Sequence, residues 1–239
     1  MDQSAKADRF RQLHLKPPIL VLPNAWDVAS AKKLAELPGC RALATTSAAV
    51  ARSLGWEDGE QAPVDEMLQA NARIAAATDL PVTGDLERGY GDPVGTARRA
   101  WGVGLVGINF EDSNVDGHVP LDEQVAAIRA IREAVPELVI NARIDSFIRE
   151  TGGIDEAVER GNAYLEAGAD CVYPIFCPVP AVADLARRIE GPINVLVIRG
   201  MPEPPELQNL GVARMTWGAG LAGLAYAEAV RVVNAALET

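Results

Sequence analysis

The residues best suited to chemistry in this chain are two carboxylates within the stretch Pro81 to Asp92. Asp85 and Glu87 follow a short apolar run, and glycines come soon after them. A buried strand that ends in acidic residues and then turns at glycines delivers those acids to the rim of a sheet. We therefore expect Asp85 and Glu87 to face a site at the end of a strand.

A third carboxylate, Glu111, ends the next apolar run, Leu105 to Glu111. Carboxylates from adjacent strands supply hard oxygen ligands, which suit Mg²⁺, or Mn²⁺ in its place, with several waters retained around the ion. The sequence leaves one structural alternative open, in which each acid caps a helix or pairs with an arginine such as Arg143. The three acids together favour a metal site.

Further polar residues follow other apolar runs. Arg143 and Asp145 end one of them, and a planar guanidinium can hold a carboxylate or a developing enolate oxygen; a salt bridge between Arg143 and an acid is the competing interpretation. The small residues Thr45 to Val50 offer free backbone amides that could bind carboxylate oxygens. Asp58 lies in a loop long enough to fold back over a metal, or it is simply an exposed aspartate.

These residues are positioned by a pattern of short β-branched runs that alternate eight times with longer helical segments. After an N-terminal helix around Ser4 to His14, this alternation predicts a parallel sheet covered by helices and, at this length, one (β/α)8 TIM barrel domain over residues 1–239. An open doubly wound sheet is the alternative, but the dinucleotide-binding spacing of glycines is missing. The predicted strands are Ile19–Pro23, Ala42–Thr46, Pro81–Asp85, Leu105–Glu111, Leu138–Ala142, Asp170–Pro174, Ile193–Val197 and Val212–Thr216.

Composition excludes several classes of function. A net charge of -11 repels nucleic acid and anionic membrane surfaces, and no apolar run is long enough to span a bilayer, so we expect a cytoplasmic protein without nucleic-acid or membrane partners. The three cysteines lack the paired spacing of a zinc site and are read as reduced core thiols. None of the four lysines follows a predicted strand, which removes the nucleophile of a Schiff-base aldolase.

Three motifs in register connect these residues to a known family. Asp85-Leu86-Glu87 with Gly89-Tyr90-Gly91, then Gly107 to Asp112, then Asn141 to Asp145 resemble the isocitrate lyase/phosphoenolpyruvate mutase superfamily in order and spacing. The resemblance runs from about Leu22 to the last helix. It implies a Mg²⁺-dependent barrel that cleaves or forms C–C or P–C bonds next to a 2-oxo acid through a pyruvate-like enolate.

The resemblance also implies roles for single residues. By position, Asp85 would be the direct metal ligand, Glu87 and Glu111 would act largely through water, and Arg143 would stabilise the enolate oxygen. The substrate carboxylate would be held by a group of smaller residues, and Asp58 would support the metal shell. That substrate group consists of Thr45, Ser47, the Ala48 amide and, from the seventh strand, Asn194. Family members are similar in forming tetramers with exchanged terminal helices, so Leu221–Leu237 is a candidate exchanged helix in a homo-oligomer, a tetramer or dimer.

One loop departs from the family. The lyases carry a Lys-Lys/Arg-Cys-Gly-His motif there, whereas this chain has the shorter Ser113 to Pro120, without cysteine. Two other positions also differ from the lyases. Asn109 stands where the lyases have a histidine, and Ile175 stands where they have a glutamate. In the shortened loop, Asn114 and His118 are the candidates for an acid, a base or a contact to the leaving group. The competing interpretation of His118 is a solvent-exposed turn residue.

The prediction from sequence is therefore a Mg²⁺-dependent, lyase-like enzyme acting on a small 2-oxo acid or dicarboxylate. Decarboxylation of an oxaloacetate-like substrate, hydrolysis of a phosphonopyruvate-like one and weak methylisocitrate-lyase-like cleavage would all use one enolate. Two alternatives stay open. One is a non-catalytic barrel that binds 2-oxo acids or dicarboxylates, and the other is a phosphate-handling barrel isomerase or synthase.

Overall fold

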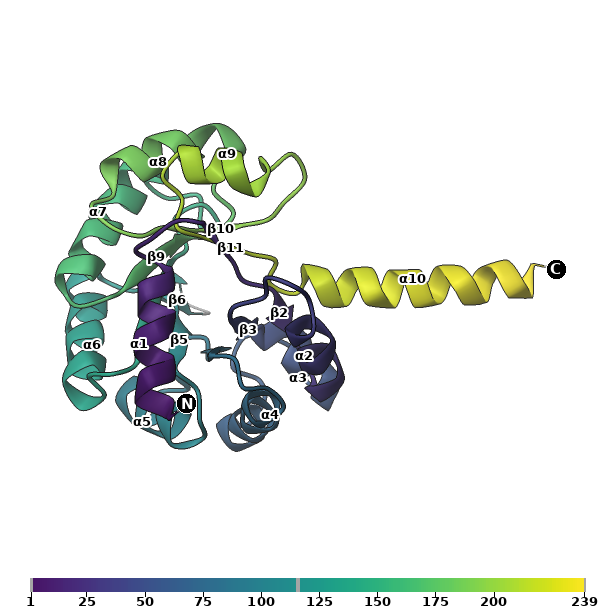
Figure 1. The fold of residues 1–239 in the computed structure, drawn as a ribbon. Coiled ribbons are helices and arrows are strands. Elements are labelled where there is room, and N and C mark those ends of the chain that lie inside the picture. Colours follow the sequence, from purple (N-terminus) through teal and green to yellow (C-terminus); the bar gives the residue numbers. More distant parts are fainter. Residues whose placement is uncertain (1, 115–116, 239) are drawn as a thin grey trace.

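A closed barrel of parallel strands forms the centre of the computed structural model, which describes residues 2–114 and 117–238 (Figure 1). The strands of its wall are short and buried. They are β1 (Leu20–Val21), β2 (Asn24–Ala25), β3 (Leu43–Thr45), β4 (Val82–Asp85), β5 (Gly107–Phe110), β8 (Val139–Ile144), β9 (Cys171–Pro174), β10 (Asn194–Leu196) and β11 (Arg214–Thr216).

The strands pair as two sheets that together close the wall. One sheet has the order β1-β11-β10 and the other the order β2-β3-β4-β5-β8-β9, with every pair parallel. An isolated bridge between Val172 and Ile193 joins β9 to β10, and β1 runs into β2 across Leu22 and Pro23. With β1 and β2 taken as one interrupted strand, the arrangement agrees with the predicted (β/α)8 barrel.

Helices follow the strands and cover the outside of the barrel (Figure 1). Their apolar faces bury residues such as Met67, Ile128 and Leu185 against the strands. The helices are α1 (Gln3–Leu13), α2 (Val28–Ala35), α3 (Ser47–Leu54), α4 (Val64–Ala76), α5 (Pro93–Gly102), α6 (Leu121–Ala134), α7 (Gly153–Glu166), the 3-10 turn η1 (Val179–Ala181), α8 (Val182–Arg188), α9 (Pro204–Asn209) and α10 (Gly220–Leu237).

Two elements were not expected from the sequence. Residues predicted as a segment of free amides after β3 form helix α3, which begins at Ser47 because Thr46 in an extended conformation precedes an alanine-rich run. The amides in question are therefore the first turn of a helix. The short loop after β5 forms an antiparallel hairpin of β6 (Ser113–Asn114) and β7 (Gly117–His118).

Helix α1 closes the N-terminal end of the barrel. Its residues Ala7 and Phe10 are fully buried in a cluster with Leu20, Leu22 and other strand residues. His14, directly after the helix, is also buried, and its Nδ1 lies 2.9 Å from the Phe10 carbonyl oxygen. The opposite end, where the strands finish, is left for the site.

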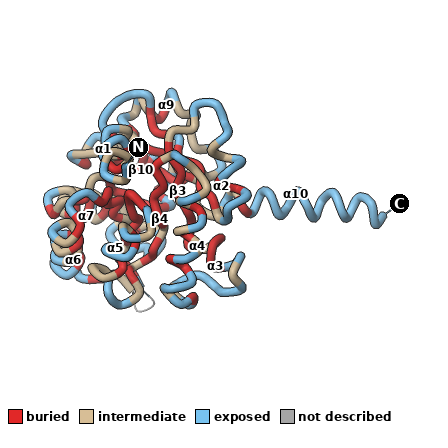
Figure 2. The backbone as a smooth tube through the Cα atoms, turned by 60° about the horizontal axis from the view of Figure 1, so that its bottom comes forward, coloured by how far each residue is buried: buried red, intermediate tan, exposed pale blue. Residues whose placement is uncertain are grey.

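Helix α10 extends away from the barrel, and nearly its whole length is exposed (Figures 1 and 2). Of its residues in the described chain, only Ala222 is buried. Its exposed large apolar residues are Leu224, Tyr226, Val230, Val232, Val233 and Leu237. Within residues 2–114 and 117–238, every helix is too short or too polar to cross a membrane.

Candidate active site

The three predicted acids lie together at the C-terminal ends of β4 and β5. Asp85 is opposite Asn109 in the parallel ladder, and the Glu111 N–H donates to the Glu87 carbonyl oxygen at 3.0 Å, which continues the same pairing. Glu87 lies just past β4 with a φ of 51°, and it lines the same cavity as Glu111. The register therefore brings Asp85, Glu87 and Glu111 to one edge of the barrel mouth.

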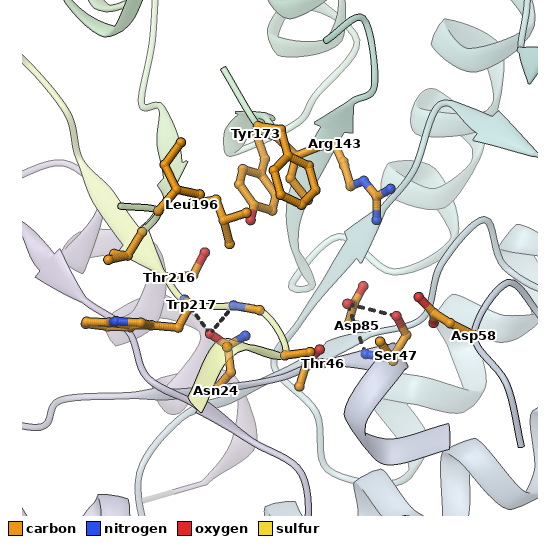
Figure 3. Close-up of a pocket in the computed structure, with 18 of the residues that line it drawn as sticks. Asn24, Thr46, Ser47, Asp58, Asp85, Arg143, Tyr173, Leu196, Thr216 and Trp217 are labelled. Carbon is orange, nitrogen blue, oxygen red and sulfur yellow. Dashed lines mark hydrogen bonds between the residues drawn. The ribbon is translucent and has the colours of Figure 1, made fainter. Parts of the chain in front are cut away.

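Asp85 is held by the neighbouring strand and helix. Its Oδ2 accepts hydrogen bonds from the Ser47 N–H at 3.0 Å and the Ser47 hydroxyl at 3.1 Å, and its own N–H donates to the Thr45 hydroxyl at 2.9 Å. Its Oδ1 is buried without a hydrogen-bond partner. Burial raises the pKa of Asp85, with Arg143 and Ser47 opposing the rise. The side chain thus points one unpaired oxygen into the site (Figure 3).

Glu87 is fixed by the loop that carries Asp58. Its Oε1 accepts from the Tyr90 hydroxyl at 2.8 Å and its Oε2 from the Glu60 N–H at 2.6 Å. The Glu60 carboxylate in turn accepts from the backbone N–H groups of Arg88 and Tyr90. Burial raises the pKa of Glu87 to about 7, with repulsion from Asp58 and Asp85 adding to the rise. The loop does fold back over the acidic edge, as the sequence suggested.

Arg143 lies between two carboxylates at the end of β8. Its Nε donates to Asp145 Oδ1 at 2.6 Å and its Nη2 to Asp145 Oδ2 at 3.1 Å, while Nη1 bonds Glu111. Burial raises the pKa of Glu111 well above its usual range, although Arg143 opposes the rise. Burial lowers the pKa of Arg143, but Glu111 and Asp145 outweigh it and keep the guanidinium charged. The salt bridge considered from sequence is present and fixes the direction of the guanidinium.

Two adjoining cavities open at this mouth. The larger has a volume of about 530 Å³ and is lined by residues that include Ser47, Ala48, Asp58, Asp85 and Arg143 (Figure 3). The smaller, about 280 Å³, shares Asp58 and Arg143 and is lined also by Glu87, Glu111 and Asn114. These eight residues, all singled out from sequence, therefore face one connected region.

Three of the residues singled out from sequence, Thr45, Asn194 and His118, do not line either cavity. Thr45 is fully buried, and its hydroxyl donates to Asn71 Oδ1 at 2.8 Å, so it supports Asp85 rather than lining a pocket. Asn194 is fully buried and donates to the Thr216 hydroxyl at 3.2 Å. Because they lie below the rim, neither has a surface on the two cavities, contrary to the expectation that they contact substrate.

His118 also lies apart from both cavities. Its Nδ1 is 3.2 Å from Glu156 Oε1 and its Nε2 is 3.6 Å from Asp112 Oδ1. The hairpin pairs His118 with Ser113, and the imidazole lies between the buried Asp112 and the partly buried Glu156 of α7. It is neither an exposed turn residue nor, in this geometry, within reach of substrate.

Several lining residues were not proposed as site residues from sequence. Asn24 accepts from the N–H groups of Trp217 and Gly218 at 2.8 and 3.0 Å, which ties the first strand to the last one. Glu60 holds the loop that carries Asp58 against the residues after β4, because its carboxylate accepts from the Arg88 and Tyr90 N–H groups. Apolar residues such as Leu196 and Ile198 line the far side of the larger cavity. Leu196 ends β10 and Ile198 follows that strand, which was the available signal, but apolar residues at such positions resemble core residues.

The donor set fits a divalent cation with a single direct protein ligand. In the described residues, no three His, Cys, Asp or Glu side chains are close enough to surround a metal by themselves. Glu87 and Glu111 already have partners, whereas Asp85 Oδ1 is a buried oxygen without one. Mg²⁺ is commonly bound by one or two carboxylates and several waters. Asp85, with Glu87 and Glu111 farther out, matches that pattern.

Comparisons with known proteins identify the family of the chain. Residues 10–237 match the family model described as Phosphoenolpyruvate phosphomutase. The chain is 37% identical to "Uncharacterized protein Rv1998c" of Mycobacterium tuberculosis over 91% of its own length and 86% of the relative. It is 34% identical to a 2-methylisocitrate lyase of Bacillus subtilis over 72% of its length and 60% of the relative.

A solved structure shows the same architecture. Oxaloacetate acetylhydrolase with the product oxalate has a TM-score of 0.86 and 26% identity, covering 98% of this chain and 87% of the other. The family match spans nearly the whole barrel and includes all three motifs recognised in the sequence. The chain belongs to the phosphoenolpyruvate phosphomutase family, within the isocitrate lyase/phosphoenolpyruvate mutase superfamily.

Proposed function

We propose that this chain is a Mg²⁺-dependent enzyme that cleaves a C–C or P–C bond adjacent to a small 2-oxo acid through an enolate. The observation that carries the proposal is the buried, unpaired Asp85 Oδ1 in the cavity that Arg143 also lines. An oxygen of this kind is costly to bury without a cation or donor. Relatives named for 2-methylisocitrate and 2,3-dimethylmalate cleavage support the reaction class.

The residues divide into three tasks. Asp85 would hold Mg²⁺ directly, and Glu87, Glu111 and Asp58 would support its shell. The bound ion would supply positive charge next to the oxygen on which the enolate develops. Arg143, held rigidly by Asp145, would add a second positive charge at that oxygen without having to reorganise.

The first turn of α3 would hold the substrate carboxylate. Ser47 and Ala48 line the cavity at a helix N-terminus, where backbone N–H groups favour anions. The Ser47 N–H and hydroxyl already donate to Asp85, so the Ala48 N–H is the donor that would meet the substrate carboxylate. Asn114, at the edge of the smaller cavity, is the remaining candidate for contact with the leaving group. His118, directed at Asp112 and Glu156, would not act as the acid in this arrangement.

The first experiment measures Mg²⁺ binding, before any assay of turnover. Calorimetric titration of the purified protein with Mg²⁺ should show binding that Asp85→Asn weakens at least tenfold, because the direct ligand loses its charge. Asp79→Asn removes the same charge at an exposed position and should bind like the parent. Equal Mg²⁺ affinity in Asp85→Asn and the parent would contradict the assignment.

Turnover then tests the reaction. Oxaloacetate, phosphonopyruvate, 2-methylisocitrate and 2,3-dimethylmalate would be assayed for pyruvate or oxalate release with Mg²⁺ and with EDTA. Activity that EDTA does not affect would refute the mechanism. Mg²⁺-dependent binding of oxalate without turnover of any substrate would instead favour the non-catalytic binding barrel.

We also propose that α10 packs against a second copy of this chain. Its exposed apolar residues, such as Leu224, Val230 and Val233, would otherwise stay in water, which costs about 25 cal/mol for each Å² of apolar surface left unburied. A Leu224→Asp/Val230→Asp double variant should have a smaller mass by light scattering than the parent, with an unchanged circular dichroism spectrum. An equal mass for both proteins would rule out this role of α10.

A further inference from the structure

The larger cavity has two chemically different halves. In Figure 3 the side chains of Arg143, Asp58, Asp85 and Ser47 gather on one side, and those of Leu196 and Trp217 lie on the other. The proposed function uses only the charged half. A ligand that fills a volume of about 530 Å³ would extend well beyond a pyruvate-sized head group.

The second half is built from packed apolar side chains. Tyr173, Ile175 and Leu196 form a buried cluster of their own, and Ile198 packs against it. All four line the cavity. This wall comes from the ends of β9 and β10, opposite the acidic edge on β4 and β5.

Two further apolar residues line the same cavity while largely exposed. Phe176 is 51% exposed and Ile148 is 41% exposed. Phe176 also has a φ of 55°, a left-handed conformation that is strained for a bulky residue. Such strain often accompanies a ligand contact, and an apolar ligand group would remove both side chains from water.

The apolar half offers an anion no positive charge among the residues that line it, although the hydroxyl groups of Tyr173 and Thr216 lie on the same side. Of the residues lining this cavity, Arg143 is the one with a cationic side chain, and Glu111 and Asp145 already pair with it. A second carboxylate or a phosphonate placed against Leu196 and Ile198 would be desolvated without a positive partner, which is strongly unfavourable.

The first turn of α10 is the competing donor group at this wall. Gly218, which precedes the helix, and Gly220, its first residue, line the cavity, but their N–H groups are already used. The Gly218 N–H donates to Asn24 Oδ1 at 3.0 Å, and the Gly220 N–H donates to the Trp217 carbonyl oxygen at 2.9 Å. These internal bonds reduce the capacity of the turn to hold an anion.

We infer that the substrate is a 4-hydroxy-2-oxo acid whose C4 carries an uncharged alkyl or aryl group, and that this group lies between Leu196, Ile198 and Phe176. When the C3–C4 bond breaks, its electron pair stays on C3 as the enolate, the apolar fragment leaves as an aldehyde or ketone, and the proton of the C4 hydroxyl ends on C3 of the pyruvate product. The inference rests on the proposed function for the position of the head group. The charged half then binds the 2-oxo acid, and the apolar half selects the substituent.

Binding of a homologous series of 2-oxo acids tests this. With Mg²⁺ present, calorimetry would compare pyruvate, 2-oxobutanoate, 2-oxopentanoate and 2-oxohexanoate. Affinity should rise about fourfold for each added methylene, which corresponds to burying one CH₂ group. The shape-matched pair 5-methyl-2-oxohexanoate and 2-oxoglutarate separates tail charge from tail size, and the branched alkyl acid should bind at least tenfold more tightly.

Variants at Ile198 test whether this side chain contacts the apolar substituent. Ile198→Ala should reduce the gain per methylene while leaving pyruvate affinity unchanged, and Ile198→Arg should reverse the preference toward 2-oxoglutarate. Leu37→Ala, an exposed position remote from the cavity, serves as the matched control and should behave like the parent.

The outcomes distinguish the two proposals. Normal Mg²⁺-dependent pyruvate binding with no gain from longer alkyl chains would overturn the inference alone. Tighter binding of 2-oxoglutarate than of its alkyl counterpart would do the same and would assign the turn of α10 as an anion site. Failure of every 2-oxo acid to bind, pyruvate included, would contradict the proposed function together with this inference.

Discussion

The buried histidine at the closed end of the barrel makes stability depend on pH. His14 is 4% exposed, and burial lowers its pKa from 6.5 to about 4. The nearby charge of Arg214 adds to the lowering, while the Phe10 carbonyl and Asp170 oppose it. In the folded protein, His14 therefore stays neutral at pH values where an unfolded chain would already bind a proton.

This difference sets the direction and the size of the effect. Between pH 6.5 and 4 the unfolded state binds one more proton at His14 than the folded state, so the free energy of unfolding falls as pH falls. A shift of about 2.5 units, at about 1.36 kcal/mol per unit, amounts to about 3 kcal/mol once the pH is below both values. Between pH 7.5 and 5.5 the free energy of unfolding falls by about 1.3 kcal/mol from this cause.

The assay is urea unfolding at pH 7.5 and 5.5, which stays above the sequence pI of about 4.7. His14→Asn is the matched variant, because its amide can still donate to the Phe10 carbonyl oxygen but does not titrate. Subtracting the variant from the parent removes the contribution of the carboxylates, which is common to both. We expect the parent to lose about 1.3 kcal/mol more than His14→Asn over this range.

Equal pH dependence in the two proteins would refute the reasoning. It would mean that His14 titrates in the folded barrel as it does in the unfolded chain, and hence that α1 does not seal this end of the barrel from water. A larger loss in His14→Asn than in the parent would be equally incompatible with a neutral, buried imidazole.

Two other substitutions test the packing around the site. Tyr164→Phe should lower the free energy of unfolding by about 1–3 kcal/mol, because the Tyr164 hydroxyl donates at 2.8 Å to the fully buried carboxylate of Asp112. Thermal and urea unfolding measure this loss, and an unchanged free energy of unfolding would contradict the prediction. Gly89→Ala should destabilise by more than about 1 kcal/mol, since φ is 91° and a Cβ would lie 2.5 Å from the Pro93 Cα. Gly102→Ala, in open space at the end of α5, is its control and should be neutral or stabilising.

Local patterns in the sequence were sufficient for the architecture and the acidic edge. Alternating apolar runs and helical segments have fixed periods, and the C-terminal ends of parallel strands must meet at one mouth. Asp85, Glu87, Glu111 and Arg143 could therefore be assigned to one region before any coordinates were known. Helix α3 was missed because the polar residues Thr45, Thr46 and Ser47, which lead into its alanine-rich first turn, also suit a loop.

Only the tertiary structure decided which side chains actually face the cavity. Thr45 is the last residue of β3 and Asn194 is the first residue of β10, and both are fully buried away from the cavities. His118 pairs with Ser113 in the hairpin, and its imidazole faces Asp112 and, from far along the chain, Glu156 of α7.

The apolar half of the cavity shows the same limit. Leu196 and Ile198 have the residue types of a core, and sequence periodicity cannot distinguish a side chain that packs against a helix from one that faces an open mouth. That distinction depends on barrel closure, when β10 and β9 bring their ends opposite the acids of β4 and β5. The sequence by itself therefore determined the type of charged group at the mouth, and the closed barrel determined the shape and polarity of the space beside it.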